Sequence, residues 1–129
     1  MKELLHPELS FRLQGRLWIA GPEDRFMGIG RLELLEKIHR LGSISRAAQE
    51  MQMSYKRAWD LVNSMNQQAR EPLVSTQAGG KRGGGAIVTA AGQQMIREFE
   101  ALQARFQAFL AEETRRLEEG PSGPPSDAQ

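Results

Sequence analysis

The stretch SRAAQEMQMSYKRAWDLV, residues 45–62, decides the fold of this chain. It predicts two helices with hardly any connection between them, the first from Ser45 to Met51 and the second from Ser54 to about Gln68. Each serine can accept a hydrogen bond from a backbone N–H of the turn that follows, which is the usual role of a helix N-cap. Two helices joined this closely cross at a steep angle, as in a helix-turn-helix.

The side chains of this stretch divide between an inner and an outer face. Ala47 and Ala48 are small enough for the two helix backbones to approach each other at the crossing. The residues expected to face a shared core are Met51, Met53, Ala58, Leu61, Val62 and Met65. Gln52 occupies the turn position that glycine often holds, which is a departure from the common pattern.

The first turns of the second helix are left outside this core and carry the candidate DNA-binding residues. We expect Ser54 to contact a phosphate, with help from the helix N-terminus. Lys56 and Arg57 suit guanine edges or phosphates, and Tyr55 suits a phosphate or an apolar contact to a base. The alternative is an ordinary pair of amphipathic helices whose Lys56 and Arg57 lie on a solvated surface.

Upstream of the helix pair, the apolar pattern changes its period. Residues 9–19 alternate between apolar and polar side chains, which predicts a half-buried strand that ends at Gly21 and Pro22. Residues 27–41 have helical spacing, and Gly42 is placed to close that helix. The apolar stripe of this helix consists of Ile29, Leu32, Leu35 and Ile38.

Downstream, two β-forming segments at residues 73–76 and 86–89 flank the glycine-rich stretch AGGKRGGG, residues 78–85. This stretch is not a nucleotide-binding P-loop, because no Lys-Ser or Lys-Thr pair follows the glycines at the required spacing. We expect a hairpin wing whose tip presents Lys81 and Arg82 to phosphates or to the minor groove. The alternative is a floppy turn that two charges keep soluble.

A long helix capped by Thr89 is expected from about Ala90 to Leu117. Its apolar residues recur at heptad spacing, and they are Met95, Phe99, Leu102, Phe106 and Phe109. Such a helix is about 40 Å long, more than a core of this size can cover. We therefore expect this seam to form a dimer interface, which would present two recognition helices to a pseudo-palindromic site. The alternative is that the helix folds back onto its own domain.

The expected fold class is mainly α with a small β-hairpin wing, that is, a winged helix-turn-helix with a long C-terminal dimerisation helix. The DNA-binding domain with its N-terminal strand spans residues 1–89 and the dimerisation helix residues 90–118. Residues 119–129 form a tail that is expected to be disordered, because almost none of its side chains are apolar.

The charge of the chain is close to neutral, at +1, but it is unevenly distributed. Residues 54–92 hold five basic and two acidic residues, whereas residues 93–129 hold four basic and seven acidic residues. The basic middle can meet a polyanion with one face. The chain has no cysteine, no apolar run long enough to span a bilayer and no signal-like N-terminus, so we expect a cytoplasmic protein.

Catalytic and metal-binding motifs are not discernible. His6 and His39 are isolated, and no carboxylate pair or Ser/His/Asp set is visible at the level of motifs. We therefore expect neither an enzyme nor a bound cofactor or metal.

Residues 31–66, above all GSISRAAQEMQMSYKRAWDLVNSMN, resemble the N-terminal DNA-binding domain of the ModE family of molybdate-responsive regulators. GGKRGGGAIVTAAGQ, residues 79–93, resembles the wing and the start of the dimer helix of that family, and VTAAG also resembles the LysR-type regulators. The resemblance covers about residues 9–117. It implies a winged helix-turn-helix homodimer at promoters of molybdenum-related genes. It also implies these recognition-helix and wing positions: Ser54, Tyr55, Lys56, Arg57, Lys81 and Arg82.

ModE proteins usually continue into C-terminal domains that bind molybdate, whereas no such pocket is visible in this sequence. The interpretation is a sequence-specific, dimeric transcription regulator that lacks a molybdate-binding domain, with sensing either supplied by a separate partner or absent. Two alternatives stay open. One is an architectural or nonspecific DNA-binding protein, and the other is a winged-helix module that binds another protein.

Overall fold

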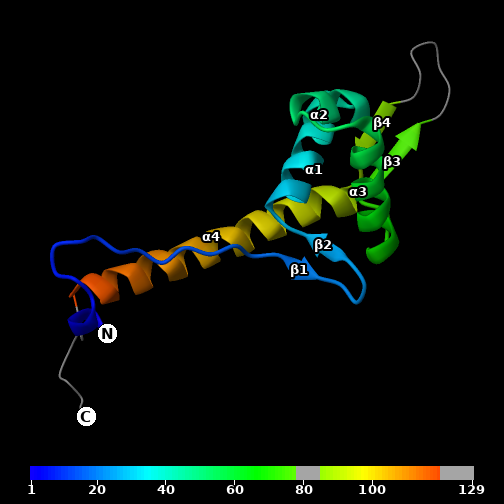
Figure 1. The fold of residues 1–129 in the computed structure, drawn as a ribbon. Helices are drawn as coiled ribbons and strands as arrows, with labels where there is room; N and C mark the ends of the chain where they lie inside the picture. The colour runs from blue at the N-terminus through cyan, green and yellow to red at the C-terminus, as the bar shows by residue number, and fades with distance from the viewer. Residues whose placement is uncertain (78–84, 120–129) are drawn as a thin grey trace. The chain divides into compact units, whose positions relative to one another are not determined.

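A computed structural model describes residues 1–77 and 85–119 of the chain, which form two compact units. The helix-turn-helix unit comprises Leu17–Ala101, and the terminal unit joins Met1–Arg16 to the part of the last helix that starts at Leu102. The elements (Figure 1) are the 3-10 turn η1 Lys2–Leu4, β1 Ile19–Ala20, β2 Arg25–Met27, α1 Ile29–Leu41, α2 Ile44–Glu50, α3 Tyr55–Gln68, β3 Val74–Gln77, β4 Gly85–Val88 and α4 Ala90–Glu119. The expected mainly α fold with a hairpin wing is confirmed.

Helix α1 supplies the centre of the helix-turn-helix core. Its buried side chains are Leu32, Leu34, Leu35 and Ile38. Ile29, which the sequence placed on the same stripe, is exposed because it is the first residue of the helix and lies outside the packed turns. Gly42 ends the helix with a φ of 69°, and its N–H donates to the carbonyl of Ile38, so the predicted glycine cap is confirmed.

Helices α2 and α3 follow at once, and one of the two predicted caps is wrong. Ser43, not Ser45, caps α2, because its hydroxyl accepts from the backbone N–H of Arg46 at 3.1 Å. Gly42 turns the chain immediately into α2, so the helix begins earlier than the spacing predicts. Ser54 caps α3 as predicted, with its hydroxyl accepting from the N–H of Arg57 at 3.0 Å.

Small and apolar side chains fill the contact between α2 and α3. Ala47 and Ala48 are buried, as expected for residues at a close helix crossing. On α3 the inward residues Ala58, Val62 and Met65 are completely buried. The expected positions Met51, Met53 and Leu61 are half-buried.

The wing is an antiparallel hairpin of β3 and β4 with a regular register from Val74–Val88 to Gln77–Gly85. Asn66 of α3 fixes it, because its Oδ1 accepts from the N–H groups of Leu73 at 2.8 Å and Val74 at 3.2 Å. Both predicted strands are therefore confirmed within one residue. Lys81 and Arg82 lie outside the described residues.

The N-terminal strand is wrong over most of its predicted length. Residues 10–18 form neither helix nor strand, and pairing starts at Ile19, opposite Met27. A strand needs a neighbouring backbone, and the neighbour that this hairpin provides is the short β2. The alternation of side chains did not reveal this lack of a partner.

Helix α4 begins as predicted, with the hydroxyl of Thr89 accepting from the N–H of Gly92 at 3.0 Å. In the helix-turn-helix unit its Phe99 is buried in the core. In the terminal unit the helix lies beside the N-terminal segment, because the N–H of Leu13 donates to Oγ1 of Thr114 at 2.8 Å. Across the described residues no helix is both long and apolar enough to cross a membrane.

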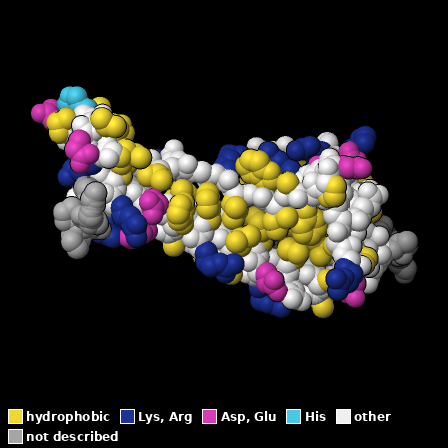
Figure 2. All heavy atoms as spheres, turned by 90° about the horizontal axis from the view of Figure 1, so that it is seen from below, with side chains coloured by type: hydrophobic (Ala, Val, Ile, Leu, Met, Phe, Trp, Pro, Cys, Tyr) yellow, Lys and Arg dark blue, Asp and Glu magenta, His cyan; other side chains and the backbone are white. Residues whose placement is uncertain are grey.

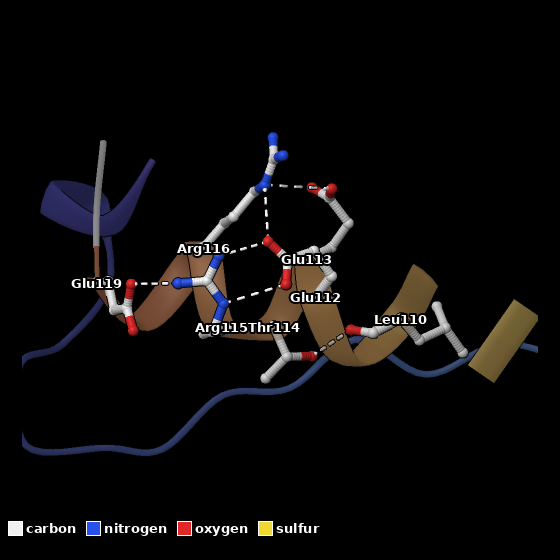
Figure 3. A network of polar contacts seen from close by, with 7 residues as sticks. All are labelled: Leu110, Glu112, Glu113, Thr114, Arg115, Arg116 and Glu119. Atoms are coloured by element: carbon white, nitrogen blue, oxygen red, sulfur yellow. Dashed lines mark hydrogen bonds and ion pairs between the residues drawn. The ribbon is translucent and has the colours of Figure 1, made fainter. Parts of the chain in front are cut away.

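The last turns of α4 carry a network of charged side chains (Figure 3). Arg115 pairs with Glu112 one turn before it and with Glu119 one turn after it. Arg116 pairs with Glu112 at 3.4 Å and Glu113 at 3.9 Å. Pairs at these spacings support a helix in water, although each contributes only about 0.3–0.5 kcal/mol.

Candidate nucleic-acid interface

The first turn of α3 presents its polar side chains to solvent. Tyr55 is 52% exposed, the side chain of Lys56 is 84% exposed, and Arg57 is also exposed. The following residue, Ala58, is completely buried, so α3 is anchored by one face and open on the other. Ser54 caps the helix and still has its own hydroxyl proton to donate. This is the arrangement of a helix that meets a ligand with its N-terminal end.

Lys56 and Arg57 differ in their surroundings. The Nζ of Lys56 lies 3.1 Å from Oδ2 of Asp60, one turn further along α3. Both side chains are largely exposed, and such a pair is weak in water, so a phosphate can replace the carboxylate at little cost. Among the described residues, no carboxylate pairs with the guanidinium of Arg57.

An open groove of about 270 Å³ separates the helix pair from the wing. Its lining includes Ser43, Ser45, Tyr55, Trp59, Thr76 and Gln77. The rings of Tyr55 and Trp59 meet edge to face, with centroids 6.2 Å apart, and form an aromatic wall. The other walls carry hydroxyl and amide groups, which are side chains that commonly bind the sugar–phosphate backbone of DNA.

Sequence reasoning missed the part of this groove that lies outside α3. Ser45, Thr76 and Gln77 come from α2 and from β3, and no local pattern marks them as functional. Their positions in the sequence offered one signal. Ser45 lies near the start of α2, and Thr76 and Gln77 end β3 just before the glycine-rich stretch. Gln77 and Gly85, the described residues on either side of the segment that contains Lys81 and Arg82, both line the groove.

A polar network fixes α3 on its supporting side. Ser64 of α3 donates to Oδ2 of Asp24 at 2.6 Å, and Arg31 of α1 donates to Ser64 at 2.9 Å and to Asp24 at 3.2 Å. Gln68 donates to the carbonyl of Arg25 at 2.8 Å. The hydrogen bonds from Ser64, Arg31 and the backbone of Arg25 hold the pKa of Asp24 below its usual value. The β1–β2 hairpin, α1 and α3 are thereby joined.

Two other carboxyl groups have shifted pKa values in opposite directions. Hydrogen bonds from Arg40, at 2.6 Å, and from Lys37 lower the pKa of Glu50, which links α1 to α2. Glu36 of α1 faces Glu100 of α4. Its side-chain hydrogen bond to Glu100, together with desolvation, raises the pKa of Glu36 to about 7. None of these groups lines the groove between the helix pair and the wing.

The predicted dimer seam on α4 is divided in the structure. Phe99 is 1% exposed and belongs to the core of its own unit, not to an open seam. Met95, Leu102 and Phe106 are half-buried, whereas Phe109 is 56% exposed. Hydrophobic side chains reach the surface on the face shown in Figure 2. The apolar surface that stays open on the seam is therefore concentrated at its end, around Phe109.

Comparison with known proteins gives one family and several relatives. The family described as bacterial regulatory helix-turn-helix protein, lysR family, matches residues 29–93. The chain is 44% identical over 93 residues to the molybdenum transport protein ModE of Azotobacter vinelandii. It is 43% identical over 96 residues to the molybdenum-pterin-binding protein MopB of Rhodobacter capsulatus. It is 41% identical over 102 residues to the DNA-binding transcriptional dual regulator ModE of Escherichia coli K12.

These similarities cover most of this chain but a minor part of each relative. They include 72%, 74% and 78% of this chain, and 34%, 36% and 36% of the three relatives. The chain thus spans about a third of the length of the curated relatives that it matches. The family match runs from the start of α1 through the wing to the first turn of α4.

Proposed function

Because this chain belongs to the lysR family of bacterial regulatory helix-turn-helix proteins, we propose that it regulates transcription by binding specific sequences of duplex DNA as a homodimer. The observation that carries the proposal is the first turn of α3, where Tyr55, Lys56 and Arg57 are exposed beside a polar groove while the rest of the helix is anchored in the core. The family is one of regulators, which is not a class of enzymes.

The proposed binding mode places the N-terminal end of α3 in the major groove. Lys56 and Arg57 contact guanine edges or phosphates there, and Tyr55 contacts a phosphate or a base. Ser54 and the N-terminus of α3 bind a phosphate. The groove beside the wing follows the sugar–phosphate backbone, and Lys81 and Arg82 add sequence-independent charge contacts.

The homodimer is proposed from the length of α4 and the apolar side chains along it. Phe109 is exposed, and Met95, Leu102 and Phe106 are half-buried, so a second chain can cover the residues that their own unit does not. A dimer places two copies of α3 on two half-sites related by a two-fold axis. Linking two weak half-site interactions raises the overall affinity.

The names of the relatives suggest which genes are involved. Two of them are called molybdenum transport and molybdenum-pterin-binding proteins, and a third is a DNA-binding transcriptional dual regulator. We propose that the DNA sites of this chain control molybdenum-related genes. Since the similarity covers about a third of each relative, the proposal for this chain concerns the DNA-binding step.

Selection of bound sequences from random duplexes, with and without molybdate, tests the proposal. We expect one pseudo-palindromic motif to be enriched, and binding that does not change with molybdate. Binding without an enriched motif, with a steep dependence on salt, would indicate an architectural protein instead. No binding at moderate salt would indicate a module that binds another protein.

A further inference from the structure

Residues 10–16 of the terminal unit form an extended edge without a backbone partner, whereas the N–H of Leu9, at the bend before them, donates to the carbonyl of His6 at 3.2 Å. Within residues 1–77 and 85–119, no hydrogen bond reaches the backbone N–H or carbonyl of Ser10, Arg12 or Gln14. The same residues lie in a segment that alternates between apolar and polar side chains. Such an edge is able to pair with another strand.

The contacts of this segment show which edge is open. The N–H of Leu13 points at α4, where it donates to Thr114 at 2.8 Å, and Gly15 lies against the ring of Phe106. Successive N–H groups of an extended chain point to opposite sides. The backbone groups of the even-numbered residues therefore point away from α4. The side chains of Arg12 and Gln14 lie together, and with the amide of Gln14 turned so that its oxygen faces the guanidinium, that oxygen accepts from Nη2 of Arg12 at 3.0 Å.

The apolar side chains of the segment reach the surface, where a second chain can cover them. Leu9 is 61% exposed, and Phe11 and Leu13 are each exposed by more than a third. They alternate with the polar residues, as in a strand that is covered on one face. Phe109 of α4, in the same unit, adds further exposed apolar surface.

We propose that residues 9–13 pair antiparallel with the same residues of a second copy of this chain, with Phe11 opposite Phe11 of that copy. The inference rests on the homodimer proposed above and says which residues form it. Because side chains alternate with a period of two, apolar residues face apolar residues only in registers that place odd positions opposite odd positions. Three such registers are compared below, and they centre the pair on Phe11, Arg12 or Leu13.

The sequence of the segment favours one of these registers. Centring the pair on Phe11 puts Leu9 opposite Leu13 and Arg12 opposite Ser10. Centring it on Arg12 puts two guanidinium groups directly opposite each other, which is destabilising. Centring it on Leu13 puts Phe11 opposite Gly15 and loses the aromatic pair. The register centred on Phe11 therefore pairs apolar with apolar side chains and sets no like charges directly opposite each other.

Cysteine cross-linking tests the register, because the chain contains no cysteine of its own. In the proposed dimer the two copies of Phe11→Cys are direct neighbours about 4.5 Å apart between Cα atoms, within disulfide range. The two copies of Leu13→Cys are displaced by four residues along the strands, or about 13 Å. Under mild copper–phenanthroline oxidation we expect Phe11→Cys to form covalent dimers roughly tenfold faster than Leu13→Cys.

Equal rates for the two variants, or a faster reaction of Leu13→Cys, would overturn the strand pairing. Sedimentation of the unmodified chain distinguishes this failure from a failure of the dimer itself. A monomer at all concentrations would overturn the homodimer, whereas a dimer without the Phe11 cross-link would overturn only the proposed pairing.

A backbone substitution gives a measurement that does not depend on cysteine chemistry. Arg12→Pro removes an N–H from the open edge, and Arg12→Ala is the matched control that keeps this N–H. We expect Arg12→Pro to raise the dimer dissociation constant roughly tenfold, because both copies lose a main-chain hydrogen bond, and Arg12→Ala to change it much less. Equal effects of the two substitutions would overturn the pairing.

Discussion

Gln52 forms the turn between α2 and α3 with a φ of 57°, in the left-handed region that favours glycine. The side chain is exposed, so its identity is not fixed by packing. The sequence marked this position as a departure from the common helix-turn-helix pattern. The structure shows that residue 52 keeps the left-handed backbone conformation of this turn, although it is glutamine and not glycine.

The strain at Gln52 gives the first prediction. Gln52→Gly is expected to stabilise the fold by up to about 1 kcal/mol, because glycine adopts a positive φ without a steric penalty. The midpoint of urea unfolding measures the change. Gln52→Ala is the control and should show no such gain, since alanine carries the same Cβ. If the glycine variant is no more stable than the alanine variant, the positive φ at residue 52 does not strain the backbone.

The ion pair on α3 gives the second prediction. If Lys56 contacts DNA, Asp60→Asn should increase the affinity for the selected duplex, because it removes both the competing carboxylate and a repulsive charge near the phosphates. Lys56→Ala should reduce the affinity roughly ten- to hundredfold if Lys56 reads a base pair. Fluorescence anisotropy at fixed salt measures both variants. An Asp60→Asn variant with weaker binding would remove Lys56 from the interface.

At the scale of the elements, α4 packs on the wing through a glycine. A Cβ on Gly92 would lie 2.2 Å from the backbone oxygen of Leu73 and 2.6 Å from Cγ1 of Val88. The first of these atoms belongs to the backbone and cannot rotate away. Gly92 is therefore required where α4 begins, next to the Thr89 cap.

This close approach gives the third prediction. Gly92→Ala should destabilise the fold by about 1–3 kcal/mol, because the wing and α4 must separate to admit the methyl group. Gly30→Ala is the matched control in α1, where nothing lies within 4 Å of the added atom. It should stabilise the fold by up to about 1 kcal/mol through helix propensity. Thermal unfolding of the two variants should shift in opposite directions, and shifts in the same direction would reject the packing argument.

The contact between α1 and α4 gives the fourth prediction, on pH. The hydrogen bond to Glu100 and desolvation raise the pKa of Glu36 from 4.5 to about 7. The folded state therefore binds the proton of Glu36 more tightly than the unfolded chain does. The contribution of Glu36 to the free energy of unfolding is consequently lost as the pH rises from about 4.5 to about 7.

Urea unfolding at several pH values measures this dependence. Glu36→Gln and Glu100→Gln should both flatten the curve over this range, because either change removes one member of the carboxyl pair. Glu71→Gln, at an exposed position, is the control and should leave the slope unchanged. A slope that persists in both pair variants would show that other groups cause it.

At the scale of the whole molecule, the proposed function requires two copies of α3 to meet the DNA. The exposed Phe109 and the open edge at residues 10–16 both belong to the terminal unit. The helix-turn-helix unit carries the residues proposed to contact DNA, at the start of α3. The proposed dimer interface and the proposed DNA contacts therefore involve different residues, and substitutions should separate them.

This separation gives the fifth prediction. Phe109→Glu should weaken the dimer and, with it, the affinity for a pseudo-palindromic duplex, while binding to a single half-site stays unchanged. Ala108→Glu, a neighbouring exposed position, adds the same charge and should leave the dimer intact. Sedimentation velocity and anisotropy on full and half sites measure the effects. An unchanged dimer in Phe109→Glu would exclude this part of α4 from the interface.

The sequence by itself determined the features that depend on neighbours along the chain. The caps at Ser54 and Thr89, the glycine end of α1 at Gly42 and the bounds of α3 all arise from contacts within one or two helical turns. Local patterns record such contacts directly. The cap at Ser43 was missed for a related reason, because a second serine two residues later fits the same local rule.

Only the tertiary structure decided the features that need a partner far along the chain. Whether residues 9–19 form a strand depends on a neighbouring backbone, which alternation cannot reveal. Whether Phe99 faces a core or a second chain depends on what packs against α4. The groove lined by Ser45, Thr76 and Gln77, and the pairing of Glu36 with Glu100, join segments tens of residues apart. Burial and polar pairing are properties of surfaces in contact, and only the folded chain brings these surfaces together.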